Sequence, residues 1–227
     1  MDRGGRRFHA VLFDVDGVLL DSAAAHRRVW DAWSLGRGLD PETVWPLTFG
    51  RRPEDTVRDT APHLDPSAER HALDALLAAE AHTFPPIPGA AALLTSLDAT
   101  GTPWALVTSG DRDSVPARFA AAGLPLPAVQ VYGADVAYAK PAPDCFRLGA
   151  ALLGVEPERF VVVEDAPAGV RAGVAAGCGV VGLTSTHEAA ALGEADRTAH
   201  SLAEVETWLS SVLVPRAAGP ARRGSLL

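Results

Sequence analysis

Short runs of apolar residues recur along this chain, separated by stretches in which alanine and leucine follow a helical spacing. Five runs have the length and composition of buried strands: 10–13, 104–107, 129–132, 160–163 and 180–183. The intervening segments predict helices at about 89–100, 112–123, 143–154 and 167–177. Several of these segments end at a glycine, as helices often do. Strands that alternate with helices indicate an α/β fold, with a parallel sheet covered on both faces.

One long stretch, residues 22–86, interrupts this alternation. It contains no run typical of a strand, and its larger apolar residues have a helical spacing: Trp30, Trp33, Leu73, Leu76 and Leu77. It ends in a proline-rich segment, 84–89, which predicts a rigid return to the sheet. We therefore expect a helical insertion above the carboxyl end of the first strand, placed as a lid would be.

Composition limits the classes of function that fit this chain. With 227 residues, 48% hydrophobic and 21% charged, it has the make-up of one sizeable globular domain with a smaller insertion. The net charge of −8 argues against nucleic acid as the main partner. No apolar run approaches the 18 residues of a membrane span, and the two cysteines have no metal-site spacing. We expect a cytoplasmic monomer with two free thiols.

The first apolar run ends in Asp14-Val15-Asp16-Gly17, two acids followed directly by a glycine turn. Open α/β sheets bind ligands at the carboxyl ends of their strands, so both carboxylates would lie at the mouth of a site. Two charges that close repel by roughly 4 kcal/mol at an effective dielectric of about 20. A hard cation, a shared proton or wide solvent exposure must relieve that repulsion. Alone, the motif is equally typical of a solvated turn.

Three further polar groups follow later runs, in this order: Thr108-Ser109-Gly110, Lys140 and Glu164-Asp165. Each has an ordinary interpretation alone, as an ST turn, a solvated loop lysine and a helix cap. In a parallel sheet, however, all four groups would converge on one crevice. Carboxylates hold Mg²⁺, a lysine and hydroxyls hold a phosphate dianion, and a pair of aspartates supplies a nucleophile and an acid–base group. Together the groups favour phosphoryl transfer.

These ordered motifs, from residue 8 to about 209, resemble the haloacid dehalogenase superfamily of phosphohydrolases. Gly50-Arg51-Arg52, Thr108-Ser109-Gly110 and residues 163–170 are similar to its small sugar and polyol phosphatases, such as those for glycerol 3-phosphate, 2-deoxyglucose 6-phosphate and mannitol phosphate. The resemblance implies a Rossmann-like, doubly wound parallel core at 1–21 and 87–213, with a helical cap at 22–86. Residues 214–227, which have no apolar period, are expected to form a disordered tail.

The resemblance also implies roles for individual residues. It makes Asp14 the nucleophile that forms an aspartyl-phosphate, and Asp16 the acid that protonates the leaving alcohol and then activates water. The implied Mg²⁺ ligands are Asp14, the backbone carbonyl of Asp16, Asp165 and, directly or through the other ligands, Glu164. The implied phosphate-binding residues are Thr108, Ser109 and Lys140. The expected reaction is Mg²⁺-dependent hydrolysis of small sugar or polyol phosphate monoesters.

Three residues of the insertion are candidate substrate contacts: His26, Arg51 and Arg52. We therefore predict that Arg52→Ala raises KM for sugar phosphates more than for an aryl phosphate. The chain departs from the family pattern at Ala139, where a glycine often precedes the lysine, and at Phe49, where the polyol phosphatases often have a histidine.

Two alternatives remain open from the sequence. A hexose-phosphate mutase of the β-phosphoglucomutase type shares the four motifs, and His26 matches its cap. Such a mutase carries an arginine where this chain has Pro53, so a residue that could bind a second phosphate is missing at that position. A non-catalytic phosphosugar-binding protein is the second alternative, although every expected carboxylate is present.

Overall fold

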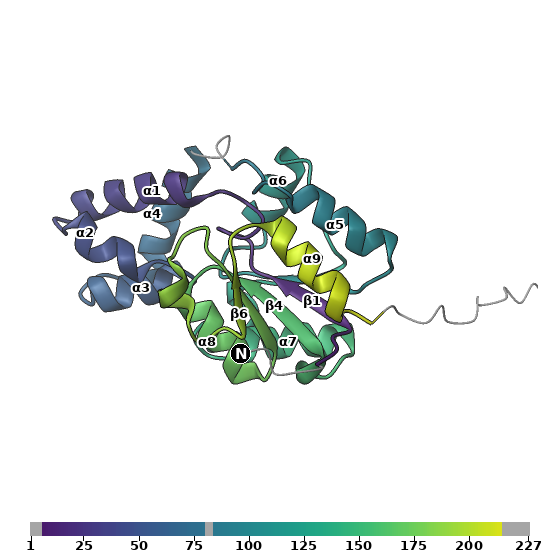
Figure 1. The fold of residues 1–227 in the computed structure, drawn as a ribbon. Coiled ribbons are helices and arrows are strands. Elements are labelled where there is room, and N and C mark those ends of the chain that lie inside the picture. The colour runs from purple at the N-terminus through teal and green to yellow at the C-terminus, as the bar shows by residue number, and fades with distance from the viewer. Residues whose placement is uncertain (1–5, 80–83, 215–227) are drawn as a thin grey trace, which may run out of the picture.

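The computed structural model describes residues 6–79 and 84–214, and within them a parallel sheet of six strands forms the centre (Figure 1). In spatial order the strands are β3 (Val129–Val131), β2 (Trp104–Val107), β1 (Ala10–Phe13), β4 (Phe160–Glu164), β5 (Gly179–Leu183) and β6 (Arg197–Ala199). β1 lies centrally, with Val11 opposite Trp104 on one side and Val161 on the other. The α/β class predicted from the sequence is confirmed.

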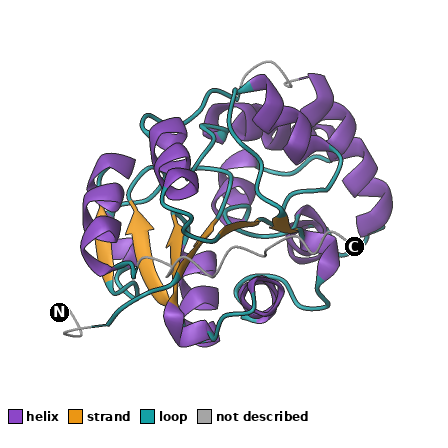
Figure 2. Cartoon of the chain, turned by 90° about the vertical axis from the view of Figure 1, so that its right-hand side faces the viewer, coloured by secondary structure: helices purple, strands orange, loops and turns teal. Residues whose placement is uncertain are grey.

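Helices cover both faces of the sheet (Figure 2). One face carries α5 (Ala90–Ala99), α6 (Ser114–Ala121) and α9 (Leu202–Val212), and the other carries α7 (Asp144–Leu153) and α8 (Pro167–Ala176). Successive strand residues serve opposite faces, so Val11 and Phe13 join one buried cluster while Leu12 joins the other. α7 and α8 are followed by Gly154 and Gly177, whose left-handed φ values of 68° and 86° end the helices as expected.

A helical insertion lies between β1 and β2 and consists of α1 (Ala23–Gly36), α2 (Pro41–Val44), α3 (Pro53–Thr60) and α4 (Pro66–Ala79). It has a hydrophobic cluster of its own, which includes Trp30, Trp33 and Leu73. The two chain segments that join it to the sheet run side by side, because Asp21 N–H donates to the Pro85 carbonyl at 2.8 Å. The sheet and the insertion therefore have separate cores and a narrow double connection.

Four short 3₁₀ helices complete the elements of the described chain: η1 (Trp45–Leu47), η2 (Gly133–Asp135), η3 (Pro157–Arg159) and η4 (Ala189–Leu192). The sequence analysis missed β6 and α9. β6 is an edge strand with a single buried residue, Ala199, so it has no apolar run to reveal it. α9 is capped at its N-terminus by Ser201, whose hydroxyl accepts from Glu204 N–H at 3.2 Å.

The predicted disordered tail lies outside the described residues from 215 onward. Its first residue, Val214, is described, and its N–H donates to the Phe8 carbonyl at 2.8 Å. Across the described residues, every helix is too short or too polar to cross a membrane.

Candidate active site

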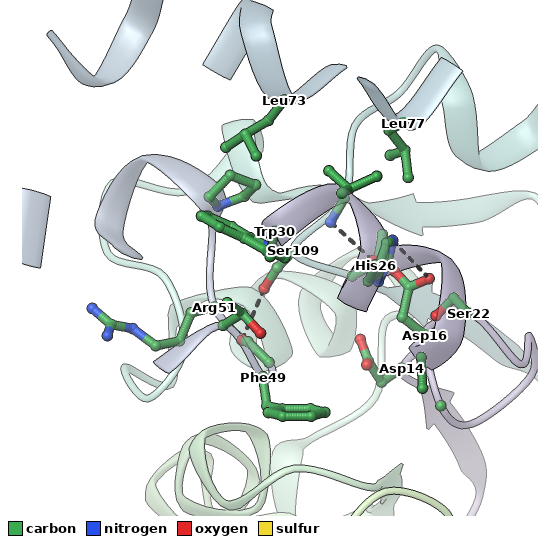
Figure 3. A pocket seen from close by; sticks show the side chains of 18 of the residues that line it. Asp14, Asp16, Ser22, His26, Trp30, Phe49, Arg51, Leu73, Leu77 and Ser109 are labelled. Carbon is green, nitrogen blue, oxygen red and sulfur yellow. Dashed lines mark hydrogen bonds and ion pairs between the residues drawn. The ribbon is translucent and has the colours of Figure 1, made fainter. Parts of the chain in front are cut away.

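A cavity lies between the carboxyl ends of the central strands and the helical insertion (Figure 3). Its core wall comes from the loops after β1, β2 and β4, and includes Asp14, Asp16, Thr108 and Asp165. Its other wall comes from the insertion, and includes His26, Trp30, Trp45, Phe49 and Leu73. The position at the strand ends follows from the parallel topology, because all such ends meet at one edge of the sheet.

Three carboxylates meet at the core wall. Asp14 follows β1 directly, Glu164 is the last residue of β4, and Asp165 comes next in the chain. β1 and β4 are paired with Phe13 opposite Val163, so the residues that follow them are brought side by side. One oxygen from each carboxylate lies within 4.8 Å of the others, and all three residues are buried.

Lys140 provides the ammonium group opposite these acids. Its Nζ donates to Asp14 Oδ1 at 2.8 Å, to Glu164 Oε1 at 2.7 Å and to the Val107 carbonyl at 3.1 Å. All three N–H bonds of this buried side chain are thus used. One positive charge faces three acids, so the cluster keeps an excess of negative charge when all three are ionised.

The acids have perturbed affinities for protons. Burial raises the pKa of Asp14 to about 7, against the opposing effect of Lys140. Burial, reinforced by Glu164 and Asp14, raises the pKa of Asp165 well above its usual range. Although burial favours a neutral amine, Asp14 and Glu164 raise the pKa of Lys140. The pattern is that of a buried site with too few positive charges.

This donor set fits a hard divalent cation, because it offers only oxygen ligands and an uncompensated negative charge. The three acids are not equivalent, however. Glu164 Oε1 accepts from Lys140, and Oε2 accepts from the backbone N–H groups of Asp165 and Ala166 at 2.9 and 3.0 Å. Asp14 and Asp165 keep more lone pairs available. Glu164 is thus placed to orient its neighbours, and Asp14 and Asp165 are placed to bind a cation.

Asp16 lies at the cavity but outside this cluster. Arg118, from α6, donates to Asp16 Oδ1 at 3.0 Å, and His26 Nε2 lies 3.9 Å from the same oxygen. Burial opposes ionisation of Asp16, but Arg118, His26 and a hydrogen bond from Ser22 outweigh it and lower its pKa. Asp14 and Asp16 therefore differ in proton affinity although they are two residues apart.

The loop after β2 carries Thr108 and Ser109, both at the cavity. Thr108 Oγ1 accepts from Gly110 N–H at 3.0 Å, which folds the loop into a turn. Ser109 Oγ donates to the carbonyl of Gly50 in the insertion at 3.0 Å. The Ser109 hydroxyl therefore connects the two walls of the cavity.

The three candidate contacts from the insertion are placed differently. His26 lines the cavity next to Asp16. Arg51 also lines it, but its guanidinium pairs with Asp59 and points away from Asp14 (Figure 3). Arg52 does not line this cavity.

The Arg52 guanidinium instead spans the two parts of the molecule. It donates to the carbonyls of Gly133, Val136 and Ala137, at 3.3, 3.2 and 3.3 Å, in the segment after β3. Its Nε also donates to Asp55 at 2.9 Å, within α3.

Sequence reasoning missed several residues of this site. Arg118 is 5% exposed and reaches Asp16, yet an arginine on a helix gives no sequence signal for burial. Arg70 of α4 lines the cavity and lies 3.2 Å from Asp111 of the core. Thr186, after β5, donates to the Asp165 carboxylate. A signal was available for Trp45 and Phe49, which line the wall with their rings 4.6 Å apart, because large aromatics between short helices suggest a buried surface.

Comparisons with known proteins agree with this geometry. The model of the haloacid dehalogenase-like hydrolases matches residues 8–177. Hexitol phosphatase A of Escherichia coli is 42% identical over 88% of this chain and 94% of its own length. The 2-deoxyglucose-6-phosphate phosphatase 1 of Saccharomyces cerevisiae is 33% identical, over 81% of this chain and 83% of its own.

Solved structures give the same result for the fold. A haloacid dehalogenase-family hydrolase from Deinococcus radiodurans, with bound phosphate and sodium, is 31% identical with a TM-score of 0.71. The match covers 92% of this chain and 97% of that one.

Proposed function

Because this chain belongs to the haloacid dehalogenase-like hydrolases, we propose that it is a Mg²⁺-dependent phosphatase for the monophosphate esters of small sugars or polyols. The observation that carries the proposal is the buried cluster at the end of β1 and β4. There, a carboxylate at the position of the nucleophile lies 2.8 Å from a lysine ammonium and beside two further acids. Relatives that are named sugar or polyol phosphatases support the substrate class.

In the proposed first step, a carboxylate oxygen of Asp14 attacks phosphorus, and the bond from phosphorus to the ester oxygen breaks. This step requires a protonated Asp16, against the effect of Arg118 and His26 on its pKa. Asp16 transfers that proton to the departing alkoxide, so that the products are an aspartyl-phosphate and a neutral alcohol. We propose that Thr108 and Ser109, with backbone N–H groups of their loop, bind the transferring oxygens. The Lys140 ammonium, whose N–H groups donate to Asp14, Glu164 and Val107, would neutralise part of their charge. Lys140 also holds Asp14 in position through its 2.8 Å contact.

In the second step, Asp16 takes a proton from water, which attacks the aspartyl-phosphate and releases inorganic phosphate and Asp14. The contact with Arg118 favours the ionised form of Asp16 that this step requires. One carboxylate thus acts first as an acid and then as a base.

We propose Asp14, Asp165 and the backbone carbonyl of Asp16 as the Mg²⁺ ligands, with Glu164 orienting them. When bound, the cation neutralises the phosphate and the acid cluster and lowers the electrostatic barrier to attack.

We further propose that the helical insertion, residues 22–86, is a cap over the core formed by residues 1–21 and 87–213. Support comes from its separate hydrophobic cluster and from its narrow connection at Asp21 and Pro85. As a cap, it would exclude water from the cavity and contact the leaving group.

A mutase must hold a second phosphate against the cap, and the charges of the cavity disfavour this. Each arginine that lines the cavity already has a carboxylate partner: Arg51 with Asp59, Arg70 with Asp74 and Asp111, and Arg118 with Asp16. Pro53 begins α3 at the position where the mutases carry an arginine. The phosphatase is therefore the better supported of the two.

The proposed working form is a cytoplasmic monomer. Cys145 and Cys178 are both free and buried, as in proteins of a reducing compartment. A molar mass equal to that of one chain, measured by light scattering after gel filtration, would support the monomer.

The direct experiment measures phosphate release from a panel of monophosphates: hexitol phosphates, 2-deoxyglucose 6-phosphate, glycerol 3-phosphate, glycolate phosphate and nucleotides. With Mg²⁺ we expect turnover of sugar or polyol esters above the others, and loss of turnover in EDTA. Activity that requires a bisphosphate primer would favour the mutase. A folded protein that binds these esters without releasing phosphate would favour the non-catalytic alternative.

A further inference from the structure

The loop that follows β5, residues 184–187, contacts three parts of the candidate site. It belongs to none of the four motifs that reveal the site in the sequence. Ser185 reaches the turn after β1, Thr186 reaches Asp165, and His187 lies against the insertion.

The Asp165 carboxylate depends on this loop. Thr186 Oγ1 donates to Asp165 Oδ2 in a short hydrogen bond and lies 3.1 Å from the Asp165 carbonyl. No other side chain within 6–79 and 84–214 donates to this carboxylate, which belongs to a 3% exposed residue. By contrast, Asp14 and Glu164 are both held by Lys140. The third member of the acid cluster is thus held by a hydroxyl.

His187 fixes the direction of that hydroxyl. Its Nδ1 lies 3.1 Å from the Asp165 carbonyl and 2.9 Å from Thr186 Oγ1. A carbonyl oxygen only accepts, so we assign a proton to Nδ1. Thr186 then accepts from His187, and its single proton is left for the Asp165 carboxylate oxygen.

The same loop holds the backbone next to that carboxylate. Ser185 Oγ donates to the carbonyl of Gly17. Gly17 has φ of 81°, and a Cβ there would lie 2.2 Å from Asp165 Oδ2. Asp165 Oδ2 therefore lies against both Gly17 and Thr186. His187 continues the contact to the insertion, since its ring lies 4.7 Å from that of Phe49 on the cavity wall.

We propose that Thr186 is a positioning residue for the divalent cation. Its hydroxyl holds the Asp165 carboxylate in the orientation in which it shares a cation with Asp14, and His187 orients the hydroxyl. The inference rests on the proposed function, because it concerns the metal of that site. Hydrogen-bond partners of metal ligands typically contribute 10–100-fold to metal affinity.

The test is calorimetric titration of Mg²⁺ into metal-free protein without substrate, so that binding is read apart from turnover. For Thr186→Val, which keeps the shape and removes the hydroxyl, we expect Kd to rise about tenfold or more. Thr186→Ser restores the hydroxyl, and we expect it to recover most of the affinity. Thr186→Ala carries the same expectation as the valine variant and replaces it if that variant does not fold.

Thr184→Val is the matched control. Thr184 lies in the same loop, but its hydroxyl contacts the Ala199 carbonyl at 3.3 Å and His200 Nδ1 at 2.9 Å, away from the acids. We expect its Mg²⁺ affinity to equal that of the unaltered protein. Equal losses in the Thr184 and Thr186 variants would mean that the loop matters only for packing, and would overturn the assignment.

Two outcomes separate this inference from the proposed function. If the unaltered protein binds Mg²⁺ and Thr186→Val binds it equally well, the positioning role is wrong while the phosphatase proposal stands. If the unaltered protein binds no Mg²⁺ but releases phosphate in EDTA, the metal-dependent function is wrong, and the positioning role with it.

Discussion

The two walls of the cavity are stabilised by different kinds of contact. On the core side, Asp14 lines the cavity, and the buried Lys140 donates to it and to Glu164 in hydrogen bonds of 2.8 and 2.7 Å. On the wall from the insertion, Trp30 and Phe49 are in ring contact with their neighbours, and Val29, Leu73 and Leu77 also line the cavity.

This difference predicts different responses to change. A buried charge without its partner is costly, so changes to the core wall should affect every substrate and also stability. Apolar contacts are non-directional and additive with area, so changes to the insertion wall should have graded effects that depend on the leaving group. The core wall thus supplies the chemistry, and the insertion wall supplies the selectivity. The four predictions below test that division.

The largest effect is expected for Asp14→Asn. The amide keeps the shape of the side chain but removes the attacking oxygen anion, so we expect turnover of every phosphate ester to fall by about 10⁴-fold or more. Phosphate release and circular dichroism measure activity and fold together. The exposed Asp113→Asn is the matched control and should keep normal turnover. A folded Asp14 variant with normal turnover would contradict the assigned nucleophile.

The next effect concerns Lys140→Met, which leaves Asp14 and Glu164 without their cation. We expect the free energy of unfolding to fall by about 3 kcal/mol, and turnover to fall for all substrates alike. Urea unfolding with and without Mg²⁺ measures the free energy of unfolding, and phosphate release measures turnover. Added Mg²⁺ should recover part of the lost stability. Arg171→Met removes an exposed cation and should change neither quantity. Full stability of the Lys140 variant without Mg²⁺ would show that the acids need no counter-charge.

A smaller effect is expected for Trp30→Leu on the insertion wall. We expect KM for sugar phosphates to rise about tenfold, while acetyl phosphate, which has almost no leaving group to contact, changes little. Trp33→Leu is the control from the same helix. Trp33 is buried, its ring centroid lies 5.3 Å from that of Trp30, and it bonds Glu69 rather than lining the cavity. It should lower stability without changing the ratio between the two substrates.

The smallest effect is expected for Arg52→Ala, and here the structure revises the expectation drawn from the sequence. The guanidinium contacts backbone carbonyls after β3 and not the cavity. KM for sugar and aryl phosphates should therefore change by the same factor, about threefold. Arg58→Ala, which removes the other arginine paired with Asp55, should leave both unchanged. A rise in KM for sugar phosphates alone would instead support the direct substrate contact that the sequence predicted for Arg52.

Much of the fold could be predicted because its signals are local. The four-residue runs at β1 and β2 are apolar throughout and fully buried, so their length and composition sufficed. β6 could not be found in this way, because at a sheet edge only Ala199 is buried.

For the candidate site, the sequence by itself determined which acids and which lysine meet. Asp14, Lys140 and Asp165 follow or face strand ends, and a parallel sheet brings such ends to one edge regardless of their separation in sequence. Tertiary structure alone decided the partners that orient them. Arg118 reaches Asp16 across 102 positions and Thr186 reaches Asp165 across 21. Both lie where sequence shows only an ordinary helix arginine and loop threonine, because a side-chain hydrogen bond depends on distances set by packing and leaves no periodic pattern in the chain.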